Sequence, residues 1–151
     1  ALPISLINTG RMAEANRYTR SSICTSGGGV CMPNAPLKWV SGQPGAWNDL
    51  LKWAHGRLVV LVFGALNRSE AQRLRELSLG ADVRVVQVVG HAREAQAVEA
   101  VLDPKGLLRN AAQADSHRWA LVRPDSYVAS TGASIDGGLV KSVARAIALS
   151  A

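Results

Sequence analysis

Cysteines and long apolar runs are scarce in this sequence, and each shortage argues against a class of function. The two cysteines among the 151 residues are Cys24 and Cys31. The six residues between them fit neither the CxxC spacing of a redox pair nor a paired zinc knuckle. We therefore expect two ordinary cysteines in a loop, and the spacing leaves a disulfide between them open.

Apolar stretches are too short for a membrane span. The longest purely apolar run covers residues 58–63, whereas a membrane helix needs ~20 residues. The first residues, ALPISLINTG, show no basic region followed by a long apolar core, so we expect no signal peptide and a cytoplasmic location. The missing initiator methionine fits a fragment cut from a longer protein.

Acidic residues are fewer than basic ones, and the formal charge is +6 from 17 basic and 11 acidic side chains. The basic residues are scattered, because Arg73 and Arg75 share a segment with Glu70 and Glu76. Nucleic-acid recognition needs basic residues gathered on one face or interleaved with aromatic residues. We therefore expect no nucleic-acid partner.

Histidines are also few, and their arrangement does not favour a metal site. His55, His91 and His117 lie at irregular spacings and in different predicted elements, as do the two cysteines. A chain of this length can bury a hydrophobic core without a metal or a disulfide. We therefore predict no metal-ligating residues.

The chain divides into an irregular lead-in or linker, residues 1–36, and a single domain, residues 37–151. Residues 26–29, SGGG, form a flexible joint. Pro33 and Pro36 disfavour a helix, because proline lacks an amide donor and restricts the residue before it.

From residue 46 onward, helices and strands alternate. Trp47, Leu50, Leu51 and Ala54 have the spacing of one helical face, and Gly56 would end that helix. Three more elements follow: a strand covered on both sides over residues 57–64, a helix over residues 68–79, and a valine-rich strand over residues 83–89.

The last third of the domain is predicted to hold two helical segments, a hairpin and a closing helix. Residues 92–102 alternate Ala and Val with Glu and favour a helix, and Asp103-Pro104 would start a further helix through Ala112. Residues 119–122 and 127–129 flank a tight turn at residues 123–126, which predicts a β-hairpin. A paired apolar stripe over residues 139–148 predicts the closing helix, with Ser134 or Asp136 as its cap.

This order is a parallel βαβ unit followed by an antiparallel ββα unit. We therefore predict an α/β protein with a thioredoxin-like fold, in which helices cover both faces of a central mixed sheet. A reactive cysteine of that fold would lie where the strand at residues 57–64 passes into its helix. The sequence there is ALNRS, residues 65–69, without sulfur.

Other catalytic arrangements are equally absent from the pattern. Thioredoxins carry a proline just before the hairpin, but residues 115–118 are DSHR, and Pro124 belongs to the turn. Ser126 has no histidine and acid in a triad pattern, and Gly137-Gly138 would bind an anion only weakly. We predict no catalytic, cofactor-binding or metal-binding residue.

Five segments together resemble a known family. They are RYTRSSI (17–23), GVCMPNAPL (29–37), NDLL (48–51), RLVVLVFG (57–64) and above all LVRPDSYVA (121–129). They are similar to the C-terminal region of FAD-dependent aromatic-ring monooxygenases of the phenol hydroxylase and 3-(3-hydroxyphenyl)propionate hydroxylase type. Ser130-Thr131 and Cys31-Met32 depart from the family pattern, which usually continues YVAW-Arg and has charged residues before the proline.

The resemblance implies a non-catalytic role. In that family, a flavin-binding and substrate domain comes first, and a thioredoxin-like domain without redox cysteines closes the chain. FAD and NAD(P)H are therefore implied for the parent enzyme and not for these residues, which hold no flavin motif. The implied partners are the flavin-binding domain of the same chain and further copies in a homo-oligomer.

Tryptophans are the predicted contact residues of such a domain. We expect Trp39 or Trp53 to anchor a domain or subunit contact, and Trp47 and Trp119 to lie in the core. Two alternatives remain open. One is a free-standing thioredoxin-like protein-binding module, and the other is a thiol oxidoreductase that uses Cys24 or Cys31.

Overall fold

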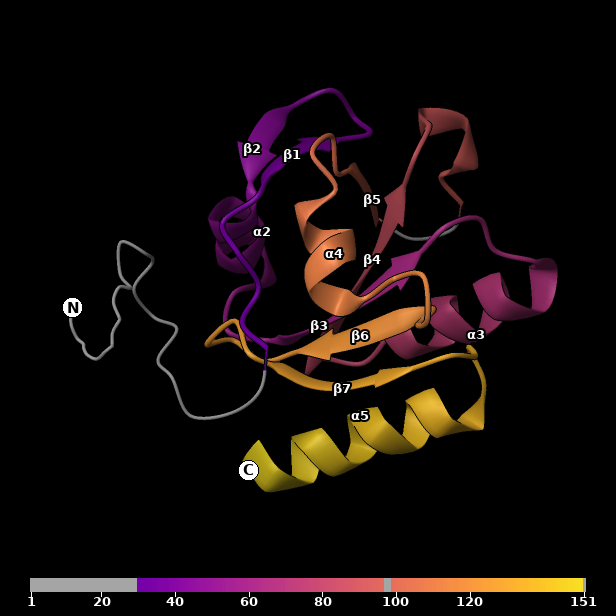
Figure 1. The fold of residues 1–151 in the computed structure, drawn as a ribbon. Helices are drawn as coiled ribbons and strands as arrows, with labels where there is room; N and C mark the ends of the chain where they lie inside the picture. The colour runs from indigo at the N-terminus through magenta and orange to yellow at the C-terminus, as the bar shows by residue number, and fades with distance from the viewer. Residues whose placement is uncertain (1–29, 97–98, 151) are drawn as a thin grey trace, which may run out of the picture.

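The computed structural model describes residues 30–96 and 99–150, which form one seven-stranded sheet and its covering helices (Figure 1). The strands are β1 (Pro36–Trp39), β2 (Pro44–Ala46), β3 (Leu58–Phe63), β4 (Val83–Val89), β5 (Glu99–Leu102), β6 (Trp119–Val122) and β7 (Val128–Gly132). The helices are α2 (Trp47–Ala54), α3 (Arg68–Ser78), α4 (Leu107–Ala112), α5 (Gly137–Ser150) and the short 3-10 helix η1 (Ala92–Glu94).

The sheet is mixed, with the strand order β2-β1-β5-β4-β3-β6-β7. β3 pairs in parallel with β4, and β4 with β5, whereas β6 is antiparallel to both β3 and β7. β3 is an inner strand between β4 and β6, and all of its residues are buried, as its uninterrupted apolar sequence predicts. The βαβ unit and the terminal hairpin with its helix are both present.

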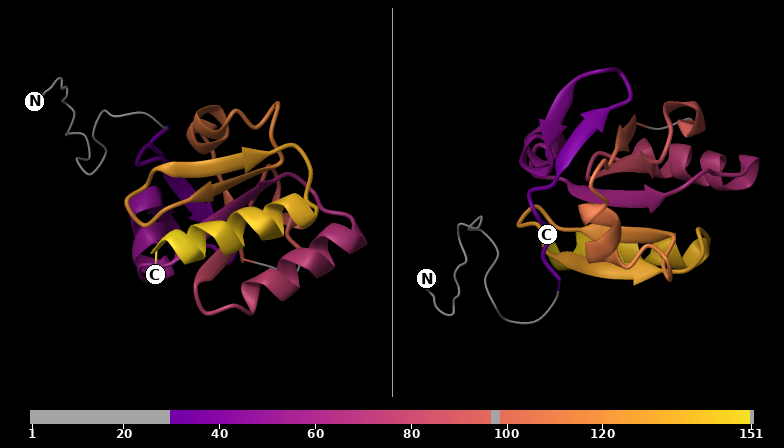
Figure 2. Two further views of the ribbon diagram at one scale, coloured as in Figure 1. Left: turned by 90° about the horizontal axis from the view of Figure 1, so that it is seen from below. Right: turned by 45° about the horizontal axis from the view of Figure 1, so that its top comes forward.

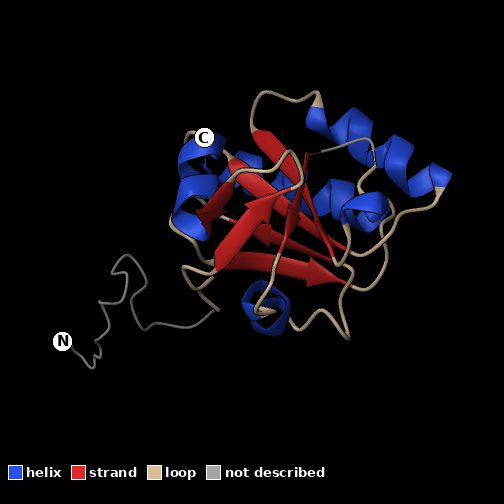
Figure 3. Cartoon of the chain, turned by 90° about the horizontal axis from the view of Figure 1, so that it is seen from above, coloured by secondary structure: helices blue, strands red, loops and turns tan. Residues whose placement is uncertain are grey.

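Helices cover both faces of the sheet (Figure 2 and Figure 3). On one face, α2 and α4 contribute buried residues such as Leu50 and Leu108 to the core cluster that includes Leu61 of β3. On the other face, α3 and α5 contribute residues such as Leu74 and Leu139 to the cluster that includes Val60. The alternation of side chains along β3 therefore divides the core into two layers.

The prediction of a helix over residues 92–102 is wrong. η1 occupies only Ala92–Glu94, and Glu99–Leu102 forms β5, a central strand between β4 and β1. Ala100 and Val101 are both buried there. Alternating small apolar and charged residues fit either element, and burial against two neighbouring strands decides for the strand.

The hairpin of β1 and β2 was not predicted, and it extends the sheet beyond β5. Leu37 pairs with Gly45, and Lys38 of β1 pairs with Leu102 of β5. Strands this short, flanked by prolines, have no clear apolar period, so long-range pairing with β5 determines their structure.

Asp103 caps helix α4, but the helix does not begin directly after it. α4 begins only at Leu107, after a turn in which Gly106 has a φ of 67°. The Asp103 carboxylate nevertheless accepts hydrogen bonds from the backbone N–H groups of Leu107, Leu108 and Arg109, at 3.0–3.2 Å. The aspartate therefore supplies the predicted cap, while the intervening turn delays the helix.

The hairpin and closing helix agree with the sequence pattern. In the turn, the Ser126 N–H donates to the Arg123 carbonyl at 2.9 Å. Of the two candidate caps of α5, Asp136 fills the role, because its carboxylate accepts from the Gly138 N–H at 2.9 Å and its carbonyl from the Leu139 N–H at 3.1 Å. The carbonyl of Ser134 instead accepts from the Trp119 indole.

Candidate functional site

The β3–α3 loop, residues 64–67, is the place where redox proteins of this architecture would carry a reactive cysteine. Gly64 turns the chain out of β3 with a φ of 89°, a conformation that favours glycine. Asn67 then caps α3: its side chain accepts from the Glu70 N–H at 2.8 Å, and the Glu70 carboxylate accepts from the Asn67 N–H at 3.1 Å. Helix capping therefore occupies the end of the loop.

Arg118 fills the space beside this loop. The residue precedes β6, at the position where thioredoxins carry a proline. Its guanidinium donates to the carbonyls of Phe63 at 3.4 Å and Ala65 at 3.1 Å. It also binds Glu70 in a bidentate pair, with both N–O distances at 3.3 Å. The position next to the missing cysteine thus carries a cation whose hydrogen bonds hold the loop.

Two glutamine side chains hold the other side of the loop. Gln87 lies fully buried in β4; its amide nitrogen donates to the carbonyls of Gly64 at 2.8 Å and Glu94 at 3.0 Å, and its oxygen accepts from the Gln96 N–H at 3.0 Å. The Gln96 side chain bonds both the N–H and the carbonyl of Leu66, at 2.6 Å each. We call Glu70, Gln87, Gln96 and Arg118 the corner network.

The corner network satisfies backbone groups and provides no reactive group. Its members are amides, a guanidinium and a carboxylate, each already bonded to the protein. In residues 30–96 and 99–150, no group of three His, Cys, Asp or Glu side chains is arranged to hold a metal ion. The arrangement can fix a loop, but it offers no nucleophile for the chemistry of thiol enzymes.

Glu94, the last residue of η1, has a pKa that its hydrogen bonds lower. Its carboxylate accepts from the N–H groups of Gly90 at 2.9 Å and His91 at 3.3 Å. These hydrogen bonds lower the pKa of Glu94 below its ordinary value of 4.5, and the charges of His91 and Arg93 act in the same direction. The charged Glu94 carboxylate therefore stabilises residues 90–94, and the Glu94 carbonyl in this segment accepts from Gln87.

The cysteine hypotheses gain no support from the described residues. Cys31 carries no free thiol, because its sulfur is in a disulfide bond. Cys31 also lies at the far end of the sheet from the β3–α3 loop, because it bridges Tyr127 and the neighbouring Val128 is aligned through Val122 with the start of β3. The other cysteine, Cys24, and the predicted joint at residues 26–29 lie outside the described residues.

The four tryptophans divide into two core residues and a half-buried pair. Trp47 and Trp119 are buried, as expected. Trp39 and Trp53 are half-buried and not exposed: their rings meet edge to face with centroids 5.2 Å apart. The guanidinium of Arg84 lies 5.1 Å from the centre of the Trp53 ring. Each ring therefore already has a partner, and both side chains remain partly exposed.

The remaining candidate residues have structural partners. His117 contacts the Ala112 carbonyl through Nδ1 at 3.0 Å, and His55 ends α2 in a left-handed conformation. Ser126 is buried and its hydroxyl makes two hydrogen bonds, and the Gly138 N–H donates to the Asp136 carboxylate. The structure does not bring the three histidines together.

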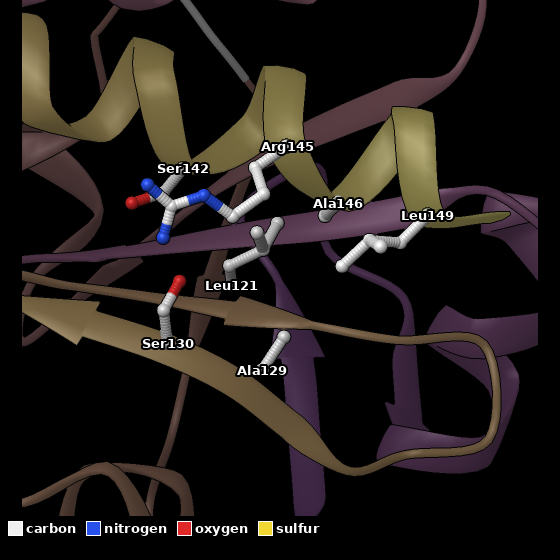
Figure 4. Close-up of a pocket in the computed structure, with 7 residues that line it drawn as sticks. All are labelled: Leu121, Ala129, Ser130, Ser142, Arg145, Ala146 and Leu149. Atoms are coloured by element: carbon white, nitrogen blue, oxygen red, sulfur yellow. The ribbon is translucent and has the colours of Figure 1, made fainter.

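A shallow hollow of about 130 Å³ lies between α5 and the hairpin (Figure 4). The lining residues are Leu121, Ala129, Ser130, Ser142, Arg145, Ala146 and Leu149. Arg145 extends from α5 toward Ser130 on β7, and Leu149 lies over the end near the hairpin turn. The Leu149 side chain is 81% exposed, so this surface has an apolar end and a cationic end.

Most members of the corner network escape prediction from sequence. Arg118 and Glu70 are 48 residues apart, and no local pattern connects them. Gln87 alone leaves a signal, because one amide interrupts the apolar sequence VRVVQVV of β4. A lone polar residue in a buried strand must find hydrogen-bond partners, which indicates a network at its position.

The fold is shared with several solved thiol-chemistry and thioredoxin-like proteins. A putative thiol:disulfide interchange protein DsbE from Chlorobium tepidum is 16% identical, with 78% of this chain and 96% of that chain covered and a TM-score of 0.59. A thioredoxin-like protein from Porphyromonas gingivalis is 17% identical, with 76% and 90% covered and a TM-score of 0.57. The domain therefore has a thioredoxin-like fold.

Family membership follows from the sequence itself. Residues 45–146 match the HcaD C-terminal domain, so the chain belongs to that family. This finding confirms the resemblance to the C-terminal thioredoxin-like domain of FAD-dependent aromatic-ring monooxygenases. A search of curated proteins gives no match. Within the described residues, no helix is long and apolar enough to cross a membrane.

Proposed function

We propose that this chain is the non-catalytic C-terminal domain of a FAD-dependent aromatic hydroxylase. Its role is to pack on the flavin domain of the same protein, to join subunits, or both. The corner network is the observation that best supports a non-catalytic role. Where related folds place a thiol, Arg118 and Gln87 bind the backbone of residues 63–65. The family assignment supports a flavoprotein parent.

The described residues do not fit FAD. A dinucleotide needs a glycine-rich turn between a strand and a helix, with free backbone N–H groups facing the pyrophosphate. The β3–α3 loop has one glycine, Gly64, and the N–H groups of Leu66 and Asn67 are bonded to Gln96 and Glu70. FAD and NAD(P)H therefore belong to the upstream part of the parent, and this chain provides no step of the hydroxylation.

Packing of the domain requires a surface, and the hollow beside α5 is the best-supported one. Leu149 is exposed at its apolar end. Lys141 and Arg145 give α5 a positive charge, and the helix contains no acidic residue. An apolar and acidic surface of the flavin domain would complement this face.

Limited proteolysis of the parent protein tests the assignment. The protein encoded by the whole reading frame should bind FAD, and cleavage before residue 30 should leave the flavin with the upstream fragment. Leu149→Asp should weaken the association of the two fragments or of subunits. Leu79→Asp is the matched control, because Leu79 is 82% exposed at the end of α3. A reading frame without a flavin domain, or flavin that remains with this domain, would reject the proposal.

A further inference from the structure

The chain enters the domain along the outer edge of β7 (Figure 1 and Figure 2). Residues 30–32 run antiparallel to residues 126–128. The Val128 N–H donates to the Val30 carbonyl at 2.8 Å, and the Met32 N–H donates to the Ser126 carbonyl at 2.9 Å. Cys31 and Tyr127 form the bridge between them. The hairpin therefore holds residues 30–32 through one isolated antiparallel bridge.

Ser126 connects this incoming segment to α2. Its hydroxyl donates to the Met32 carbonyl at 3.2 Å and accepts from the Trp47 indole N–H at 2.7 Å. Ser126 is 1% exposed, and Trp47 is fully buried. Because both groups lie away from water, loss of the hydroxyl would leave a buried donor and a buried acceptor with no partner.

The backbone at Ser126 indicates that the hydroxyl matters. The residue has a φ of 77°, in the left-handed region where glycine is the unstrained choice. Glycine would remove the strain, but it would also remove both side-chain hydrogen bonds. Serine at this position is therefore explained by what its hydroxyl holds and not by the turn alone.

The first turn of α2 provides a second attachment for the incoming chain. The Trp47 N–H donates to the Ala35 carbonyl at 2.8 Å, and the Asn48 N–H donates to the Asn34 side chain at 2.9 Å. These bonds satisfy N–H groups that a helix leaves without internal partners. Ala35 is fully buried and belongs to the hydrophobic core, so this attachment lies in the protein interior.

We propose that Ser126, Trp47 and Asn34 form a linker clamp, which fixes the point and the direction at which the polypeptide preceding residue 30 joins the domain. The segment that the clamp holds is residues 30–35 of this chain. The consequence for an upstream flavin domain rests on the proposed function: the clamp would set the point on this domain from which the linker to it starts. Asn34 and Ser126 lie in GVCMPNAPL (29–37) and LVRPDSYVA (121–129), so the clamp joins two segments that are distant in the sequence.

Hydrogen exchange of the 151-residue chain tests the clamp. In Ser126→Gly, the backbone strain disappears and the hydroxyl is lost, so the Met32 and Val128 amides should exchange about tenfold faster, which corresponds to the loss of about one net hydrogen bond. Amides of Val60 and Leu61 in β3 should keep their protection. Trp47→Phe, which removes the donor to Ser126 together with part of a buried ring, should also speed exchange at Met32 and Val128. Ser130→Ala, on the same hairpin, is the control and should change neither amide.

Two outcomes would overturn the proposal. Unchanged exchange at Met32 and Val128 in Ser126→Gly would mean that the hydroxyl holds nothing. Equal acceleration at Met32 and Leu61 would mean that Ser126 supports the whole core and not the incoming segment. Both readouts use the chain without flavin, so they stand or fall independently of whether the parent binds FAD.

Discussion

Arg118 and Glu70 form a bidentate ion pair across 48 residues of sequence, with both N–O distances at 3.3 Å. The pair joins the start of β6 to the first turn of α3. The Glu70 side chain is 17% exposed and that of Arg118 is 35% exposed, so solvent screens the pair only in part. With the carbonyls of Phe63 and Ala65 bound to the same guanidinium, the β3–α3 loop is fixed by charge-assisted hydrogen bonds.

Arg118→Ala should destabilise the domain by about 1–2 kcal/mol, because it removes these hydrogen bonds. The loss is limited because water can solvate the partly exposed Glu70 carboxylate in the variant. Urea unfolding measures the change. Arg123→Ala is the matched control: Arg123 pairs with Asp125 in the exposed turn, and its removal should cost about 0.5 kcal/mol or less. Equal effects of the two substitutions would contradict a structural role for Arg118.

Gln87→Leu keeps the size of the side chain and removes its amide. The carbonyls of Gly64 and Glu94 and the N–H of Gln96 would lose their buried partner, so we expect a loss of about 2–3 kcal/mol in the free energy of unfolding. Gln72→Leu on the exposed side of α3 should change stability by only about 0.5 kcal/mol. A neutral Gln87→Leu would show that the amide network is dispensable.

Gly132→Ala tests a close approach inside the hairpin. A Cβ at Gly132 would overlap the indole ring of Trp119, which is itself buried and bonded to the Ser134 carbonyl. We expect a destabilisation of about 3 kcal/mol, or a shifted Trp119 ring with altered fluorescence. At Gly137, by contrast, a Cβ would meet no neighbouring atom, so Gly137→Ala should be tolerated. Thermal unfolding of the two variants measures the difference.

The pH dependence of stability should include a contribution from Glu94. Hydrogen bonds from Gly90 and His91 lower the pKa of Glu94 in the folded state below its ordinary value of 4.5. Its contribution is therefore fully present above about pH 4.5 and is lost as the pH falls through the folded pKa. The stability difference between the native chain and Glu94→Gln should shrink over that window, and an NMR titration of the Glu94 carboxyl should give a midpoint below 4.5. A midpoint above 4.5 would contradict the hydrogen bonds.

Elements whose apolar residues follow one clear pattern, either an uninterrupted run or a helical stripe, are predictable from the sequence. β3 and α5 are of this kind, because LVVLVF has only one place in a sheet with two covered faces and α5 has apolar residues at helical spacing. β5 is different: EAVL is apolar enough for a helix, and its pairing with β1 and β4 comes from distant residues. Long-range pairing also explains why the β1–β2 hairpin was not predicted.

The absence of a cysteine in the β3–α3 loop could be predicted from the sequence, but the contacts of Arg118 beside that loop could not. Residues 65–69 contain no cysteine, and that absence is visible in the sequence. Arg118 stands in a segment, DSHR, with no feature that announces a contact with Glu70. The position of Ser126 inside a turn motif likewise conceals its bond to Trp47, which is 79 residues away. Contacts of this separation depend on the assembled fold.

Dithiothreitol-driven reduction of insulin disulfides tests most directly the claim that this thioredoxin-like domain performs no thiol chemistry. The rate with the 151-residue chain should equal the rate without protein, and Cys24→Ser and Cys31→Ser should leave it unchanged. A protein-dependent acceleration that either serine substitution abolishes would contradict the account.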